Sequence, residues 1–280
     1  LLIKVIIWKN TQESKNEALQ LAVKFGSPYI TPFNNLFEIG RIFYNGMDGY
    51  EINKKLTVEC YKRLTFIRKN TLAIYLYATM LKNGDGVQKD EITANYLFEK
   101  ADGENSYSDM VEYAIRLYDG DGIKADKKRA AQYFKKSALL GCHEAKYHYA
   151  NMLYNGEEFE ADKKEAARIY SQLNNYDFDI DCESGKKLAE MLYYGDGIDQ
   201  NKKEAAKIYK ELIRAGDEDS MIKYTNMLYN GDGIDQDKKE AASILKTYAD
   251  YNSNYAIDKY SSMLLNGDGI DSDPNEAAKY

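Results

Sequence analysis

Acidic residues crowd several glycine turns of the chain closely enough to suggest calcium binding. Residues 232–237 carry Asp232, Asp235 and Asp237 within six positions. An EF-hand loop places its oxygen ligands at positions one, three and five, with glycine at six and a bidentate glutamate at twelve. Here Gly233 follows the first aspartate directly, and the acids are out of that order. We therefore interpret the turn as structural and expect neither a metal nor another cofactor.

The two histidines are the other candidate metal ligands. His143 and His148 lie five residues apart, one more than in the zinc-protease motif. Five helical residues turn the side chain by about 140° beyond a full circle, so the two rings point apart. The sequence also lacks a nucleophile elbow, a phosphate-binding loop and a dinucleotide fingerprint. We predict a protein that is not an enzyme and has no catalytic residues.

Composition narrows the classes of partner and the compartment. A net charge of −7 disfavours a nucleic-acid binder, which needs a basic surface to displace counterions. The three cysteines do not follow any repeat and the chain has no Asn-X-Ser/Thr site, which favours free thiols and a cytoplasmic location. The secretory pathway stays open as an alternative. No apolar stretch is long enough to span a bilayer.

Tyrosine is unusually frequent, with 26 residues against nine phenylalanines. Two explanations stay open. The first is a compositional bias that fills the core with tyrosine, and the second is an interaction surface, where tyrosine is a preferred anchor.

The glycine turns recur along the whole chain. Between the first glycines of successive turns the steps are 38, 36, 36, 39, 36 and 36 residues, and two turns, at Gly46 and Gly156, depart from the pattern. A period of this length indicates stacked supersecondary units that share one core. The turn glycines that we predict to be structural are Gly84, Gly86, Gly120, Gly122, Gly195, Gly197, Gly231, Gly233, Gly267 and Gly269.

Helical spacing precedes each turn. Counting back from the first glycine, the third and seventh residues are large and apolar, so they share one helical face, and the sixth is small, which predicts close approach of another helix. In one repeat these residues are Leu228, Tyr224 and Thr225.

A second helix is predicted after each turn by a capping box, in which the capping side chain accepts from the first-turn amides and the glutamate three residues on reaches back. The boxes begin at Asp162, Asn201, Asp237 and Asp273. The box that begins at Asp126 departs from the pattern, because Arg129 replaces the glutamate.

The pattern of these helices and turns resembles the Sel-one-like repeat, a relative of the tetratricopeptide repeat. The best match spans residues 188–216, with the glycine turn followed by a Lys-Lys-Glu-Ala-Ala run. The resemblance implies an all-α, right-handed α-α superhelix (solenoid) of about seven helix-turn-helix repeats of 36–39 residues. It further implies a non-catalytic adaptor for protein assemblies. We expect residues 1–30 to form a degenerate repeat or N-terminal cap and residues 31–280 the solenoid, with its last repeat cut off in the second helix.

The resemblance places the first helix of each repeat on the concave face, where a partner protein or extended peptide would bind. The fifth and eighth residues before the glycine lie three apart, on a face other than the packed one. Its lysines would attract an acidic extended segment. The alternative is that these are ordinary exposed residues. The predicted partner-binding residues are His148, Asn151, Lys187, Glu190, Lys223, Asn226, Lys259 and Ser262, and the same positions earlier in the chain are Leu76, Thr79, Glu112 and Ile115.

Three further hypotheses remain open at this stage. Residues 174–181, where the step lengthens to 39, form either a binding loop or a slack connection. The repeats could be the regulatory or targeting arm of a larger enzyme or signalling protein. They could also belong to a secretory-pathway adaptor in protein quality control.

Overall fold

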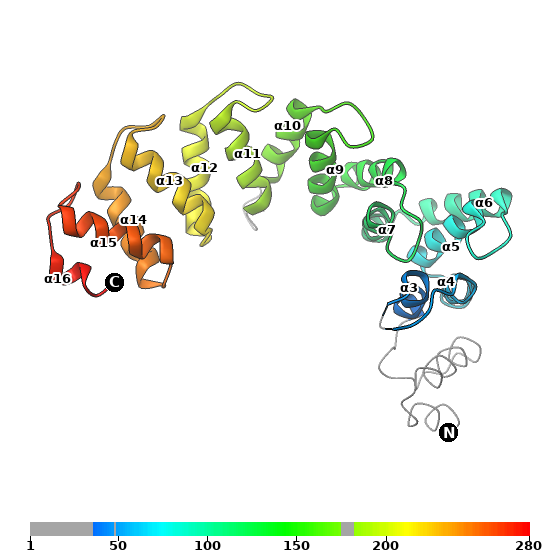
Figure 1. The fold of residues 1–280 in the computed structure, drawn as a ribbon. Coiled ribbons are helices and arrows are strands. Elements are labelled where there is room, and N and C mark those ends of the chain that lie inside the picture. Colours follow the sequence, from blue (N-terminus) through cyan, green and yellow to red (C-terminus); the bar gives the residue numbers. More distant parts are fainter. Residues whose placement is uncertain (1–35, 48, 175–181) are drawn as a thin grey trace, which may run out of the picture. The chain divides into compact units, whose positions relative to one another are not determined.

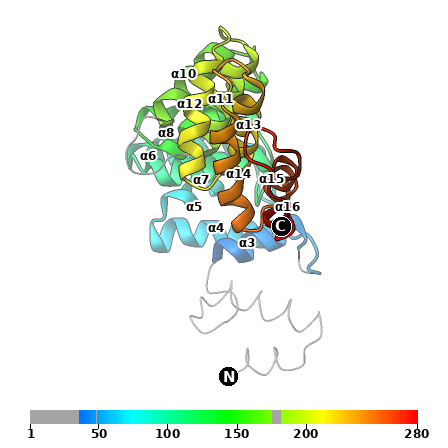
Figure 2. The ribbon, with the colours of Figure 1, turned by 90° about the vertical axis from the view of Figure 1, so that its left-hand side faces the viewer.

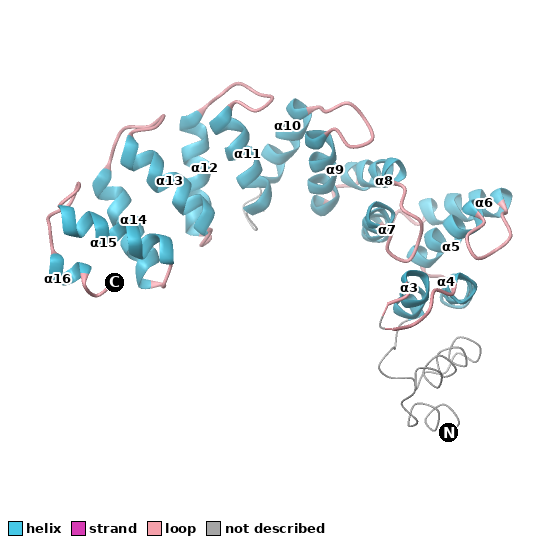
Figure 3. Ribbon diagram, viewed as in Figure 1, coloured by secondary structure: helices cyan, strands magenta, loops and turns pink. Residues whose placement is uncertain are grey.

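The computed structural model describes residues 36–47, 49–174 and 182–280, and within them the chain forms fourteen helices and no strand (Figures 1 and 3). The all-α, helix-turn-helix fold predicted from the repeat is therefore confirmed. The predicted N-terminal region, residues 1–30, lies outside the described residues, as does most of the inserted segment, residues 174–181. The chain divides into two compact units, Leu1–Ala145 and Lys146–Tyr280, which we call the N-terminal part and the C-terminal part.

Within each part, most helices pack against the next helix along the chain, and Figure 2 shows them from a second side. The helices that begin in the N-terminal part are α3 (Leu36–Asn45), α4 (Lys54–Arg68), α5 (Thr71–Asn83), α6 (Glu91–Gly103), α7 (Tyr107–Asp119), α8 (Lys127–Leu139) and α9 (His143–Asn155), whose first turn precedes the boundary. Those of the C-terminal part are α10 (Lys163–Asn174), α11 (Cys182–Tyr194), α12 (Lys202–Arg214), α13 (Glu218–Asn230), α14 (Lys238–Asp250), α15 (Asn254–Asn266) and α16 (Pro274–Ala277).

Main-chain hydrogen bonds close each helix pair at the glycine turn. Gly231 follows α13 in the left-handed region, with φ of 67°, where glycine has no side-chain penalty. The next amide, of Asp232, donates to the carbonyl of Met227 at 3.0 Å, as in a Schellman ending. The amide of Asp237, which caps α14, then donates back to the carbonyl of Leu228 at 2.9 Å.

This last bond corrects half of the predicted capping box. The Asp237 side chain does accept from the Glu240 amide, at 2.8 Å. The glutamate, however, does not reach back to the cap amide, because Leu228 already accepts that hydrogen. Glu240 instead accepts from Lys210, on the preceding second helix, at 2.8 Å, and Glu276 accepts from Lys246 at 2.6 Å. Glu240 and Glu276 therefore link successive repeats, whereas Glu165 and Glu204 pair with Arg168 and Lys207 of their own helices.

The predicted apolar and small positions lie in the core. Leu228 and Tyr224 are 3% and 5% exposed, and Thr225 between them is 2% exposed. The reason for the small residue is clearest at Gly40, where an added Cβ would come within 2.6 Å of the Tyr61 ring. Tyrosine fills much of the core itself, with Tyr61, Tyr75, Tyr113, Tyr170 and Tyr209 almost fully buried.

Side chains also join four of the glycine turns to the preceding helix pair. Asp196 accepts hydrogen bonds from Tyr154 on α9 and Lys163 on α10, each at 2.5 Å. The lysine ammonium also lies 4.8 Å from the centre of the tyrosine ring, and its stem would clash at 2.3 Å with a Cβ on Gly197. We call this arrangement the tyrosine–aspartate–lysine joint.

The joint repeats with the period of the chain. In the C-terminal part it recurs at Asp232, with Tyr193 and Lys202, and at Asp268, with Tyr229 and Lys238. In the N-terminal part it occurs at Asp85, with Tyr44 and Lys54.

Asp121, in the turn after α7, is held differently. Its carboxylate contacts Arg41 at 3.4 Å and the buried Arg116 at 3.6 Å, and it accepts from the Asn45 amide at 2.7 Å. The preceding helix pair carries Lys82 at the position of the joint tyrosine and Glu91 at that of the lysine. Neither offers the usual donor pair, so Asp121 is held by residues of α3 and of its own helix.

Candidate protein-binding face

The eight predicted partner-binding residues lie on α9, α11, α13 and α15, all within the C-terminal part. We call them together the first-helix face. None of the eight is buried: Glu190, Asn226, Lys259 and Ser262 are exposed, and the other four are half-buried. The structure thus leaves this face accessible to solvent, as a binding surface requires.

Each lysine of the first-helix face lies against a tyrosine rather than a carboxylate. The Lys223 ammonium donates to the Tyr194 hydroxyl at 3.2 Å and lies 5.5 Å from the centre of that ring. Lys187 lies 5.8 Å from the ring of Tyr154, and Lys259 lies 5.9 Å from that of Tyr255. None of the three lysines forms an ion pair among the described residues. Their positive charges therefore stay available to an acidic partner.

The asparagines of the face already accept hydrogen bonds from tyrosines. Asn226 accepts from the Tyr255 hydroxyl at 3.0 Å, and Asn151 accepts from Tyr170 at 2.5 Å. These bonds occupy the amide oxygens and leave the amide N–H groups as donors. The face thus presents N–H donors and ammonium groups, both of which suit carboxylate or carbonyl oxygens.

A pocket of about 260 Å³ lies between α13 and α15 and contains three of the predicted residues, Asn226, Lys259 and Ser262. Tyr229, Asn230, Tyr255, Asn266 and Asp268 line it as well and were not predicted as binding residues. Two of these residues, Asn230 and Asn266, could have been found from the sequence, because each directly precedes a turn glycine. Tyr255 could have been found one helical turn before Lys259, on the same face.

The face does not continue onto α5 in the N-terminal part. Leu76 is 0% and Thr79 3% exposed, so these two do not project into a groove. The reason is that α5 packs directly against α7, and the Thr79 and Tyr113 hydroxyls hydrogen-bond at 2.6 Å. Glu112 is taken up by an ion pair with Arg116 at 2.9 Å.

The residues suspected of other chemistry do not come together. Within residues 36–47, 49–174 and 182–280, no three histidine, cysteine, aspartate or glutamate side chains form a group that could hold a metal ion. Cys60, Cys142 and Cys182 are all free thiols, as predicted. None of the described helices is both long and apolar enough to cross a membrane.

Two solved structures have a similar fold. One is c5321, a protective antigen present in uropathogenic Escherichia coli strains that displays an SLR fold. It matches with a TM-score of 0.60 and 20% identity over 94% of this chain and 54% of its own, so this chain spans about half of its length. The other is a Sel1 repeat protein from Oxalobacter formigenes, with a TM-score of 0.53 and 21% identity over 88% of this chain and 97% of its own. At these identities the likeness concerns the fold alone. No curated protein matches the sequence.

The family comparison covers most of the helix pairs described above. The model of the Sel1 repeat matches six segments, residues 71–101, 109–142, 143–173, 186–217, 219–246 and 254–280. Proteins built from this repeat are generally protein-interaction scaffolds and typically have no catalytic role. With more than half of its residues in matched repeats, the chain belongs to the Sel1 repeat family.

Proposed function

We propose that the protein is a non-catalytic scaffold that binds an extended, acidic segment of a partner protein along the first-helix face. The observation that carries this proposal is the row of Lys187, Lys223 and Lys259, spaced 36 residues apart, each against a tyrosine and none in an ion pair among the described residues. Their regular spacing supports repeated contacts with one extended chain.

Tyrosine adds contact area beside each charge. Tyr194 is 60% exposed, and tyrosines are frequent anchors at protein interfaces because they bury a large surface at a low cost in side-chain entropy. The backbone of an extended segment would accept hydrogen bonds from the amide groups of Asn226 and Asn151, while its acidic side chains would pair with the lysines.

The direct test uses a fluorescein-labelled decamer of glutamate and, for comparison, a decamer of glutamine. We expect the glutamate peptide to bind more tightly, with an affinity that falls as salt is added, because exposed charges are screened. Reversing two charges by Lys187→Glu with Lys223→Glu should weaken binding by at least about ten-fold. Fluorescence anisotropy measures both quantities.

The matched control reverses two exposed lysines on the second helices, by Lys203→Glu with Lys239→Glu. It changes the net charge equally, so it should leave the affinity within about two-fold of the original protein if position matters more than total charge. Equal loss of binding in both variants, or unchanged binding in the first, would place the partner elsewhere. Melting temperatures of both variants check that the fold is intact.

A further inference from the structure

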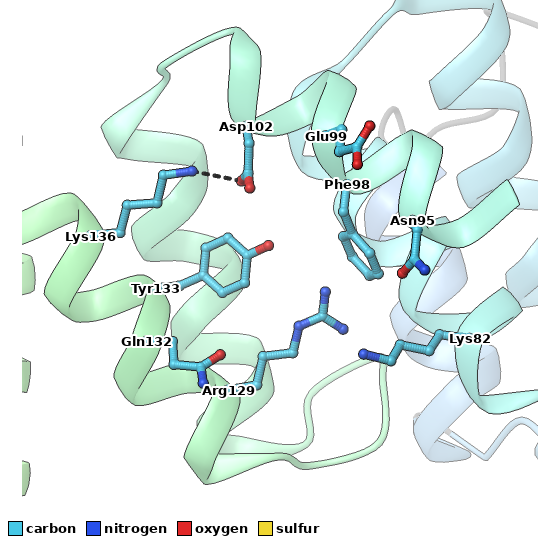
Figure 4. A pocket seen from close by; sticks show the side chains of 9 residues that line it. All are labelled: Lys82, Asn95, Phe98, Glu99, Asp102, Arg129, Gln132, Tyr133 and Lys136. Atoms are coloured by element: carbon cyan, nitrogen blue, oxygen red, sulfur yellow. Dashed lines mark ion pairs between the residues drawn. The ribbon is translucent and has the colours of Figure 1, made fainter. Parts of the chain in front are cut away.

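A second candidate site lies in the N-terminal part. It is a pocket of about 440 Å³ lined mainly by α6 and α8 (Figure 4). Three cations, Lys82, Arg129 and Lys136, and two carboxylates, Glu99 and Asp102, face it. The site shares no residue with the first-helix face.

The Arg129 side chain lies against three aromatic rings in this pocket. Its guanidinium lies 3.7 Å from the centre of the Phe98 ring and 5.7 Å from those of Tyr113 and Tyr133. Cation–π contacts of this kind hold the planar group in one orientation. Arg129 has no ion pair with a carboxylate among the described residues. The aromatic rings therefore hold its guanidinium in place without neutralising its charge.

The charges here are inverted relative to the later repeats. In the last repeats a lysine on one second helix pairs with the glutamate near the start of the next, as Lys210 does with Glu240 and Lys246 with Glu276. The corresponding residues of α6 and α8 are Glu99 and Arg129. Their charges are opposite, yet they form no ion pair, because Arg129 lies over Phe98 instead. The lysine–glutamate link of the last repeats is therefore absent from this position.

A second cation converges on the same place. Lys82 replaces the joint tyrosine of its repeat and is exposed. Figure 4 shows its ammonium end and the guanidinium of Arg129 reaching toward each other across one side of the pocket. On the other side Lys136 is paired with Asp102 at 3.1 Å, and Tyr75 also donates to that carboxylate at 2.9 Å. An anion placed between Lys82 and Arg129 would be attracted by both positive charges.

We propose that this pocket binds a carboxylate of a peptide, with Arg129 donating from its fixed fork and Lys82 from the opposite side. A guanidinium fork matches the two oxygens of a carboxylate. A phosphate dianion suits the pocket less well, because Glu99 and Asp102 lie in the same pocket and repel the larger charge. Glu99 would instead accept an N–H group of the bound peptide.

The test titrates the full chain with small probes and follows the side-chain Nε–H resonance of Arg129 by NMR. N-acetylphenylalanine carries a terminal carboxylate, N-acetylglutamic acid α-amide carries only a side-chain carboxylate, and N-acetylphenylalanine amide carries neither. We expect a saturable shift with a carboxylate probe, and the better of the two identifies the source of the group. An equal response to the amide, or tighter binding of inorganic phosphate, overturns the proposal.

Two variants complete the test, with the binding of the carboxylate probe measured by calorimetry. Arg129→Glu introduces the residue that Glu165, Glu204, Glu240 and Glu276 provide in other repeats and should weaken binding by at least about ten-fold. Glu99→Lys combined with Arg129→Glu recreates the ordinary lysine–glutamate link, which keeps the fold intact if the single variant melts early. This double variant should also lose binding. Probe affinity equal to that of the original protein in a folded double variant contradicts the assignment.

Discussion

The glycine turns join repeats in two ways: the regular joint occurs at three turns of the C-terminal part and at Asp85, and a different arrangement occurs at Asp121 in the N-terminal part. In the C-terminal part, Asp196, Asp232 and Asp268 each accept from a tyrosine and a lysine of the preceding helix pair. In the N-terminal part, Asp121 is held by two arginines and an asparagine instead.

The difference teaches that the turn aspartate is a general acceptor whose partners can be exchanged. The two kinds of joint differ in how deeply the positively charged side chain is buried. The side chain of Arg116, beside Asp121, is 9% exposed, whereas that of Lys202, beside Asp232, is 28% exposed. A charge that is withdrawn from water depends more strongly on its counter-ion. Three experiments on stability can break or sharpen this comparison.

The largest effect is expected at the second glycine of the turn, where both parts are crowded. A Cβ on Gly122 would lie 2.5 Å from the Tyr61 hydroxyl, and one on Gly233 would lie 2.2 Å from the Lys202 side chain. Gly122→Ala and Gly233→Ala should each lower the free energy of unfolding by about 3 kcal/mol, from the left-handed backbone and overpacking together.

The control for these variants is Gly216→Ala. Gly216 has a φ of 87° but no atom within 4 Å of an added Cβ, so only the backbone penalty of about 1 kcal/mol applies. Denaturant unfolding gives the free energy of unfolding of each variant, and hydrogen exchange shows which part of the molecule is destabilised. If all three variants lose the same amount, the close contacts contribute nothing.

The next effect separates the two kinds of joint. Asp121→Asn removes the charge beside the buried Arg116, and we expect a loss of about 2 kcal/mol. Asp232→Asn keeps an oxygen for Tyr193 and breaks only a partly exposed ion pair, so about 0.5 kcal/mol is expected. Hydrogen exchange localised to each part measures both. Equal losses would show that burial of the arginine does not distinguish the joints.

The smallest effect is a pH dependence from the three joints of the C-terminal part. Hydrogen bonds from the lysines lower the pKa of Asp196, Asp232 and Asp268 below its usual range. A lowered pKa in the folded state contributes stability that is present above about pH 4 and is lost as the pH falls through the folded-state value.

The measurement compares the original protein with a variant that carries Asp→Asn at all three positions. Their melting temperatures should differ by a constant amount near neutral pH, and the difference should shrink below about pH 4. A difference that stays constant down to pH 2 would show that the ion pairs do not contribute.

Local pattern was enough to predict the helices, the turns and much of the core. Leu228 and Tyr224 could be placed because helical periodicity relates residues four apart. The joints could not be predicted in the same way. Tyr193 and Asp232 are 39 residues apart, and the sequence does not show that one repeat's tyrosine meets the next repeat's turn.

The binding face shows the same limit. Exposure of Lys223 and Asn226 follows from the helical pattern, but burial of Leu76 and Thr79 at the same positions depends on how closely α5 approaches α7. In the sequence, the only sign of the pocket was that Arg129 replaces the glutamate of the capping box. The contact of Arg129 with Phe98 joins two different helices, so it could be found only from the structure.

The main-chain bond from each cap amide to the preceding helix has a mechanical consequence. It ties the two helices of a repeat together through atoms that no substitution other than proline removes, as between Asp237 and Leu228. The polar links between successive repeats are side-chain contacts that are partly exposed to water. When tension is applied to the two ends of the C-terminal part, the contacts between repeats should therefore break before the two helices of any one repeat separate.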